Sequence, residues 1–216
     1  MDRVDYKTIY KYGEDEIIIN KSRFIGYAKP VETEEEAQAF IEEISKKHYD
    51  ATHNVWAYVL GLDSMTQRFS DDGEPSGTAG IPMLEVIKKE GLVNLVVVGT
   101  RYFGGIKLGA GGLIRAYTRT SKIGIDAGLI VDMILHKIIK IRLDYTLYGS
   151  IENFLLTNKY IIKDSSFDDA VNIEVYIRAG QLEAFKNKII DLTSDTAIIR
   201  ELGEEYLAMR DNKRLK

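Results

Sequence analysis

The chain has 216 residues, of which 45% are hydrophobic and 29% charged, and it contains three prolines and no cysteine. This composition is typical of a globular protein and excludes a largely disordered or collagen-like chain. The lack of cysteine also excludes disulfides, cysteine nucleophiles and thiolate zinc sites.

The N-terminal segment and the hydropathy of the chain bear on its location. The first residues, MDRVDYKTIYKYGEDE, are rich in charge and lack the apolar stretch of a signal peptide. No run approaches the roughly 20 apolar residues that a membrane-spanning helix needs. We therefore expect a cytoplasmic protein that uses no membrane and no cofactor, and we leave its oligomeric state open.

The charges are unevenly distributed along the chain. The net charge is -4, from 29 basic and 33 acidic residues, and residues 1–90 carry 18 acidic against 11 basic side chains. Residues 91–125 contain no acidic residue and five basic ones, namely Arg101, Lys107, Arg115, Arg119 and Lys122. A positive segment in a mildly acidic body is the first place to look for an anionic ligand.

The first part of the chain alternates strand and helix patterns. Thr33 and Glu36 form a capping-box pattern that predicts the start of a helix. A continuous apolar run at residues 92–98 predicts a central strand buried on both faces. In chain order we predict strands at 16–20 and 23–31 joined as a hairpin, a helix from Thr33, strands at 54–60 and 67–70, a helix at 81–89 ended by Gly91, the strand at 92–98, and a helix at 111–127 ended by Gly128.

The pattern starts again after residue 132. We predict strand 136–144, helix 149–157, strands 160–165 and 172–178, helix 181–192 and strand 197–207. This βαββαβ order is that of a ferredoxin-like sandwich. We therefore predict an α+β protein with two domains, an N-terminal α/β domain at 1–132 and a ferredoxin-like domain at 133–216.

The glycine-rich segment before the helix at 111–127 has the features of an anion site. Five glycines, Gly104, Gly105, Gly109, Gly111 and Gly112, allow backbone N–H groups to approach a ligand, and a helix N-terminus adds further donors. Arg115, Arg119 and Lys122 follow at helical spacing on one face, and Arg101 and Lys107 flank the loop. The spacing matches neither a P-loop nor a dinucleotide fingerprint, so we expect a polyphosphate or nucleic-acid backbone. The alternative is that the glycines serve helix packing and the basic stripe is an ordinary solvated face.

The acidic turn at residues 70–80 is the second candidate site. Asp71, Asp72 and Glu74 have no calcium-loop register, so we expect no metal there, although Mg²⁺ or Ca²⁺ stays an alternative. His53 is the histidine placed to meet this turn, and together with the carboxylates it leaves a hydrolytic site open. The aromatic residues among the basic ones, Tyr102, Phe103 and Tyr117, fit either base stacking or a core.

Two long motifs resemble one known family. They are RFSDDGEPSGTAG at residues 68–80 and VVGTRYFGGIKLGAGGL at residues 97–113, and the likeness extends from KSRF at 21–24 through HNVWAY at 53–58 to about residue 127. The chain is similar to the bacterial branch of the IMPACT family, often called YigZ. The resemblance implies an N-terminal domain like domain four of elongation factor G and a C-terminal domain like its domain five.

The resemblance also implies a function. Eukaryotic members regulate translation initiation by competing for the activator of a stress-responsive initiation-factor kinase. They carry a further N-terminal interaction domain before the shared core, so we expect that this kinase-pathway role does not apply here. What transfers is a link to translation and a functional surface at the two motifs, comprising Asp71, Asp72, Glu74, Arg101, Gly104, Gly105, Lys107 and Gly109. We expect a translation regulator that binds RNA or a ribosome-associated partner through the glycine-rich loop and basic helix. One alternative is a hydrolase acting on a phosphate-bearing or peptide-like substrate with His53, Asp71, Asp72 and Glu74. A further alternative is a pure protein-interaction module.

Overall fold

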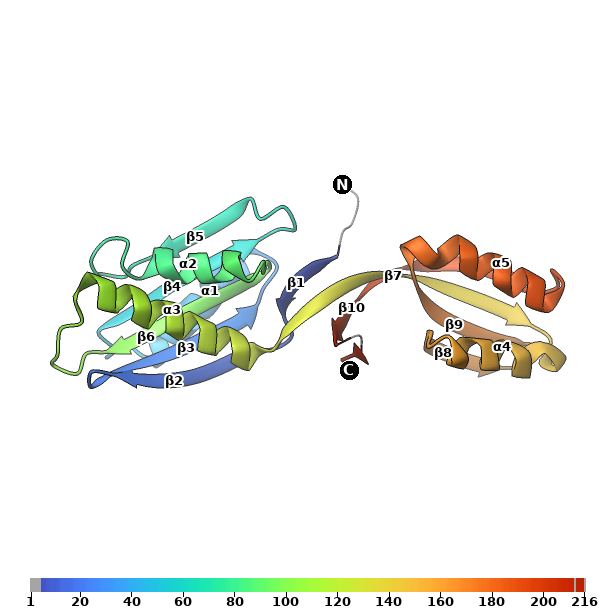
Figure 1. The fold of residues 1–216 in the computed structure, drawn as a ribbon, viewed down its shortest axis with the longest axis horizontal. Helices are drawn as coiled ribbons and strands as arrows, with labels where there is room; N and C mark the ends of the chain where they lie inside the picture. The colour runs from blue at the N-terminus through green and yellow to red at the C-terminus, as the bar shows by residue number, and fades with distance from the viewer. Residues whose placement is uncertain (1–4, 212, 216) are drawn as a thin grey trace. The chain divides into compact units, whose positions relative to one another are not determined.

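A computed structural model describes residues 5–211 and 213–215. The chain divides into two compact units, each drawn in Figure 1. The first unit contains residues 6–133 with 208–211 and 213, and the second contains Asp5, 134–207 and 214–215. The domain limits expected from the sequence, at residues 132 and 133, stay a prediction. Within the described ranges, no helix has the length and hydropathy of a membrane span.

The first unit is built on a five-stranded antiparallel sheet with the order β2-β3-β6-β4-β5. The predicted hairpin is confirmed, because Asn20 and Lys21 form a two-residue turn with φ of 46° and 64°. A two-residue turn needs positive φ at both positions if its twist is to match that of the two strands. A buried central strand is also confirmed, but it runs over Leu95–Tyr102 instead of residues 92–98. The strands are β2 (Gly13–Ile19), β3 (Ser22–Pro30), β4 (His53–Leu60), β5 (Thr66–Ser70) and β6 (Leu95–Tyr102).

Side chains alternate across β6 and so build two separate cores. Val96 and Val98 pack with α1 (Glu34–Lys47), whereas Leu95 and Val97 pack with α2 (Gly80–Lys89) and α3 (Gly109–Gly128). The helices therefore lie on opposite faces of the sheet, with α2 and α3 together on one face. The predicted cap of α1 is confirmed, because the side chain of Thr33 accepts a hydrogen bond from the N–H of Glu36.

The end of α3 differs from the prediction. Gly91 has a φ of +68° just after α2, as expected of a helix stop, but Gly128 is the last residue of α3 and Leu129 is the residue with a positive φ, of 66°. A Cβ on Gly128 would lie 3.0 Å from the carbonyl oxygen of Lys11. Gly128 is therefore needed for close packing against the N-terminal segment, not for the turn.

The second unit has the predicted βαββαβ order, and the α+β class is confirmed. Its strands follow the order β10-β7-β9-β8 around one hydrophobic core, as in a ferredoxin-like sandwich. Two short strands were not predicted from the sequence: β1, which lies in the first unit and pairs with residues 130–133 of β7, and β11, which pairs with β10. The strands of this sheet and the helices that accompany it are β1 (Tyr6–Ile9), β7 (Ile130–Leu143), α4 (Tyr145–Thr157), β8 (Ile161–Phe167), β9 (Val171–Arg178), a 3₁₀ turn (Ala179–Gln181), α5 (Leu182–Thr193), β10 (Ile198–Arg210) and β11 (Lys213–Arg214).

Two of these boundaries correct the sequence analysis. Strand β7 begins at Ile130 instead of residue 136, because its first residues pair with β1. Helix α4 begins at Tyr145 instead of residue 149, because Asp144 accepts a hydrogen bond from the N–H of Thr146 at 2.9 Å and caps the helix.

Candidate functional site

A buried ion pair lies between the two sequence motifs. The guanidinium of Arg101, on β6, donates from Nη1 to Oε1 of Glu74 at 2.7 Å, and the hydroxyl of Tyr117, on α3, donates to the same oxygen at 2.8 Å. Burial, followed by the negative charge of Glu74, raises the pKa of Tyr117 well above its ordinary value, so the phenol stays protonated. The three side chains tie the acidic turn, the central strand and α3 together.

Arg101 therefore does not belong to the exposed anion site in which the sequence analysis placed it. The residue is only 5% exposed, and its guanidinium lies between the rings of Phe24 and Phe103, 5.4 and 5.3 Å from their centroids. Its Nε has no hydrogen-bond partner among the described residues. Both faces of β6 are covered, and the alternation along the strand places position 101 on the same face as Leu95 and Val97, beneath α2 and α3.

The histidine and the second aspartate of the acidic turn lie together, as expected. Nδ1 of His53 lies 2.6 Å from the carbonyl oxygen of Asp72, so Nδ1 carries the proton and donates it. Nε2 of His53 lies 3.8 Å from Oε1 of Glu74, beyond hydrogen-bond reach. The carboxylate of Asp72 accepts the backbone N–H of Asn54 at 2.5 Å, which holds the turn against β4.

Asp71 has a separate, local role. Its carboxylate accepts hydrogen bonds from three backbone N–H groups, those of Gly77, Ala79 and Gly80, at 2.8, 3.1 and 2.8 Å. It therefore satisfies the donors at the start of α2, where the residue before the helix, Ala79, makes no side-chain cap. Each acidic side chain of the turn is thus engaged by the fold. No group of three or more potential metal ligands occurs within the residues that the structure describes.

The exposed part of the candidate site is a hollow beside α3, of about 390 Å³. It contains two of the predicted basic residues, Arg115 and Arg119, and one of the predicted glycines, Gly112. The described residues that line it include no acidic side chain. The lining residues are Ile19, Asn20, Leu108, Gly112, Arg115, Ala116 and Arg119.

The charges in this hollow are uncompensated. In the described part of the chain, neither Arg115 nor Arg119 forms an ion pair or a side-chain hydrogen bond, whereas Lys122, one turn further on, bonds Asp126 at 2.5 Å and Glu90 at 3.4 Å. Lys122 is therefore partly neutralised and does not line the hollow. The predicted basic stripe is reduced to its first two members.

The start of α3 adds backbone donors to this surface. Leu108 precedes the helix and provides no side-chain cap, and the first turn holds no acidic residue. The first N–H groups of a helix without a cap are open to water or to a ligand, and the helix dipole favours an anion there. Lys107, in the loop just before the helix, is exposed. This end of α3 is therefore electropositive.

The glycines of the loop have different structural roles. A Cβ on Gly104 would lie 2.1 Å from the carbonyl of Lys21, so this glycine lets the loop pack on the β2–β3 turn. Gly105 and Gly109 have φ of +83° and +68° and nothing within 4 Å of an added Cβ. A Cβ on Gly112 would lie 2.9 Å from that of Leu108. Gly105, Gly109 and the exposed Gly111 therefore leave backbone accessible, whereas Gly104 and Gly112 serve packing.

Sequence analysis missed the contribution of the β2–β3 turn. Asn20 lines the hollow, and Lys21 is brought to the glycine-rich loop by the contact with Gly104. The two-residue turn could be predicted from the sequence. Its contact with the glycine-rich loop could not, because more than 80 residues separate the turn from α3. Tyr117 is fully buried, in agreement with the interpretation of the aromatic residues as part of the core. The side chain of Phe103, in contrast, is 45% exposed.

Comparisons with known proteins agree with the motifs. Residues 20–125 match the family model described as the Impact N-terminal domain, and residues 141–196 match that described as Domain of unknown function (DUF1949). The IMPACT family member YvyE of Bacillus subtilis (strain 168) is 46% identical over 202 residues, which are 94% of this chain and 93% of the relative. The IMPACT family member YigZ of Escherichia coli (strain K12) is 48% identical over 101 residues, 46% of this chain and 50% of the relative.

One solved structure is similar over nearly the whole chain. It is described as the crystal structure of an hypothetical protein, is 30% identical, and superposes with a TM-score of 0.59 over 91% of this chain and 97% of its own. Together with the relatives it supports the two-sheet fold. The chain belongs to the IMPACT family, as its two motifs predicted.

Proposed function

We propose that this protein binds RNA through the hollow beside α3 and the glycine-rich loop, and that it acts on translation by this contact. Family membership supports the link to translation, which the sequence resemblance implied. The RNA backbone is the ligand whose chemistry fits the hollow. A ribosome-associated protein is the alternative partner.

The observation that carries the proposal is the pair of uncompensated arginines at an uncapped helix start. Arg115 and Arg119 lie one helical turn apart, and arginine matches the geometry of phosphate oxygens. The amide groups at Gly109 and Gly111 provide further donors beside them. A ligand with several phosphates in a row would engage more of these groups than a single phosphate.

Phe103 supports a single-stranded ligand. Its ring is 45% exposed, and the guanidinium of Arg101 lies 5.3 Å from its centroid on one side. A base can stack on an exposed aromatic ring, and such stacking contributes about 1–3 kcal/mol per base in single-strand binders. We therefore expect preference for single-stranded over double-stranded RNA.

The test is salt-dependent binding of a labelled single-stranded RNA, measured by fluorescence anisotropy at salt concentrations from roughly 50 to 300 mM. The double variant Arg115→Ala/Arg119→Ala should bind more weakly, and its slope of log affinity against log salt should fall by about 0.7 for each phosphate that the variant no longer neutralises. The matched control is Lys46→Ala/Lys89→Ala, which removes the same charge from two other positions of the same unit.

Each outcome separates the alternatives. If the control variant weakens binding as much as the arginine variant, the effect is one of net charge and the hollow is not the site. If wild-type protein binds no RNA but binds ribosomal particles, and the arginine variant fails to bind them, the partner is a ribosome-associated protein. Hydrolysis of a phosphate-bearing or peptide substrate that His53→Ala abolishes would favour the enzyme hypothesis instead.

A further inference from the structure

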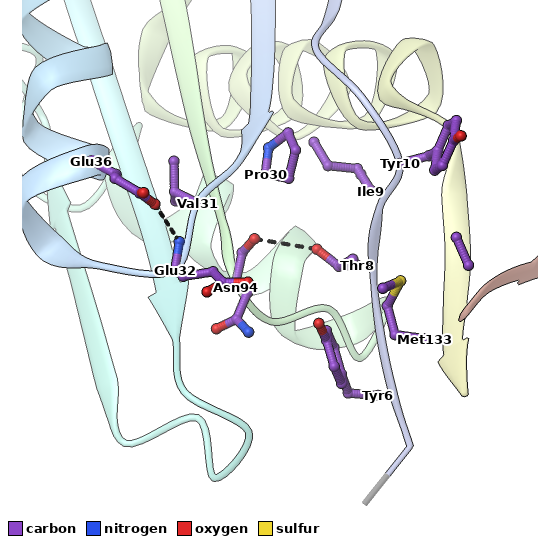
Figure 2. Close-up of a pocket in the computed structure, with 11 residues that line it drawn as sticks. Tyr6, Thr8, Ile9, Tyr10, Pro30, Val31, Glu32, Glu36, Asn94 and Met133 are labelled. Atoms are coloured by element: carbon purple, nitrogen blue, oxygen red, sulfur yellow. Dashed lines mark hydrogen bonds between the residues drawn. The ribbon is translucent and has the colours of Figure 1, made fainter. Parts of the chain in front are cut away.

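A second hollow, of about 400 Å³, lies in the first unit, and none of its lining residues belongs to the two sequence motifs. Figure 2 shows its two walls, one formed by β1 and Met133 and the other by the end of β3, the start of α1 and Asn94. The side chain of Thr8 donates a hydrogen bond to the carbonyl oxygen of Asn94 at 3.2 Å and joins the walls. None of the candidate site residues from the sequence analysis lies here, so this hollow is independent of the proposed function.

The chemistry of its lining is apolar and acidic. Tyr6, Tyr10 and Met133 provide aromatic and apolar surface, whereas the charged lining residues are Glu32 and Glu36. The described residues that line the hollow include no lysine or arginine. This combination is the opposite of that in the hollow beside α3, where the charged lining residues are arginines.

The two carboxylates keep acceptor capacity for a ligand. One oxygen of Glu36 accepts the backbone N–H of Glu32 at 2.7 Å, which is part of the cap of α1. A carboxylate has about four acceptor positions, so this bond leaves others open. Within the described part of the chain, neither Glu32 nor Glu36 forms an ion pair.

Other acidic residues of α1 near the hollow also favour a cationic ligand. The first turn of α1 contains Glu34 and Glu35 as well as Glu36, so several negative charges gather at this wall. They disfavour an anionic ligand and attract a cationic one. Aromatic faces bind organic cations in addition to apolar groups. The volume of about 400 Å³ lies within the range of small-molecule sites, roughly 300–1,000 Å³.

We propose that this hollow binds a small organic amine, with its ammonium group at the carboxylates of Glu32 and Glu36 and its apolar body against Tyr6, Tyr10 and Met133. The ligand is defined by two features, one positive charge and an apolar body the size of a bicyclic ring. A ligand with only one of these features would match either the carboxylates or the apolar residues of the lining, but not both. An amine therefore binds better than a neutral or an anionic molecule of the same shape.

The test compares three probes that share an indole ring and differ in charge: tryptamine, 3-ethylindole and indole-3-propionate. Calorimetric titration of the full chain should show tryptamine binding about tenfold or more tightly than the other two. The double variant Glu32→Gln/Glu36→Gln should remove this preference. Glutamine at position 36 keeps an oxygen for the N–H of Glu32, and the control Glu35→Gln removes a charge from the same helix turn outside the lining.

A second measurement locates the ligand. The methyl carbon signal of Met133 should shift on adding tryptamine to wild-type protein, and it should shift equally in Arg115→Ala/Arg119→Ala, because the two hollows are separate. Equal affinity for all three probes, no binding of tryptamine at millimolar concentration, or binding without a shift at Met133 would each overturn the proposal. Loss of binding in Glu35→Gln to the same extent as in the double variant would overturn it as well.

Discussion

The guanidinium of Arg101 lies 2.7 Å from the carboxylate of Glu74, and both side chains are almost completely withdrawn from solvent. A buried charge without its partner costs far more than an exposed one, because the protein interior replaces little of the missing hydration. The hydroxyl of Tyr117 completes the group from α3. The two sequence motifs are thus joined inside the fold, and Tyr117 ties the middle of α3 to the acidic turn.

The first prediction concerns this pair. Glu74→Ala should lower the free energy of unfolding by about 3–5 kcal/mol, because it leaves Arg101 charged and buried. The double variant Glu74→Leu/Arg101→Met should recover most of that loss, since no unpaired charge remains. Urea denaturation of the three proteins measures the effect. A double variant no more stable than Glu74→Ala would mean that packing, not charge pairing, holds this region.

The second prediction concerns Asp71. Asp71→Ala should destabilise the protein by about 1–2 kcal/mol, because two N–H groups at the start of α2 and that of Gly77 in the preceding turn lose their acceptor. Asp71→Asn keeps one oxygen acceptor and should cost less. Thermal denaturation of both variants checks the order, and an asparagine variant that is no more stable than the alanine variant would contradict a capping role.

The third prediction is that the acidic turn holds no tightly bound metal. Asp71 is engaged by backbone N–H groups, Asp72 by the N–H of Asn54 and Glu74 by Arg101, so binding a cation would break several hydrogen bonds. Calorimetric titration with Mg²⁺, Ca²⁺ and Mn²⁺ should give no site of micromolar affinity. A stoichiometric site that Asp72→Asn removes would revive the hydrolase hypothesis.

Local patterns in the sequence were sufficient for much of the fold. The Thr33–Glu36 capping box predicted the start of α1, and the apolar run before Gly99 predicted the central strand. The βαββαβ order followed from the spacing of apolar residues. The β-strand β1 was not predicted, because its pairing partner at Ile130 lies more than 100 residues away and its four residues have no pattern of their own.

The candidate site was predicted less well, for the same reason. Arg101 was assigned to the exposed loop because the predicted strand ended at residue 98, whereas β6 continues to Tyr102 and buries the side chain of Arg101 on the same side of the sheet as Leu95 and Val97. The approach of the Asn20–Lys21 turn to the glycine-rich loop could not be predicted from the sequence either, because it depends on the order of strands in the sheet.

The fourth prediction is a loss of stability in mild acid, caused by buried histidines. His48 accepts the hydroxyl proton of Tyr27 at Nε2 and donates from Nδ1 to Tyr102, whose own hydroxyl proton goes to Asp50. Burial, and after it the positive charge of Lys47, lowers the pKa of His48. Burial likewise lowers the pKa of His136 in the second unit.

The sign of the pH effect follows from these directions. The unfolded chain binds a proton near pH 6.5 while the folded chain does not, so stability is full above pH 6.5 and falls as the pH drops toward the lowered folded pKa. Each histidine contributes a slope of up to about 1.4 kcal/mol per pH unit in that window. Urea denaturation from about pH 5 to about pH 7.5 should show a shallower slope in His48→Gln than in wild type. Identical slopes would mean that folding does not lower the pKa of His48.

The fifth prediction separates packing from ligand binding among the glycines of α3. A Cβ on Gly124 would lie 2.8 Å from the carbonyl carbon of Gly26, a backbone atom that cannot move aside alone, so Gly124→Ala should destabilise the protein by about 1–3 kcal/mol. A Cβ on Gly111 would meet only Nη1 of Arg115, at 3.7 Å, so Gly111→Ala should stabilise the helix by up to about 1 kcal/mol.

If RNA contacts the amides at the start of α3, the added methyl group of Gly111→Ala should nevertheless weaken RNA binding, so that stability and affinity change in opposite directions. Thermal denaturation measures the stability of each variant, and fluorescence anisotropy on the same samples measures its affinity for RNA. Unchanged affinity in Gly111→Ala would mean that the start of α3 is not part of the binding surface and that only the arginines are.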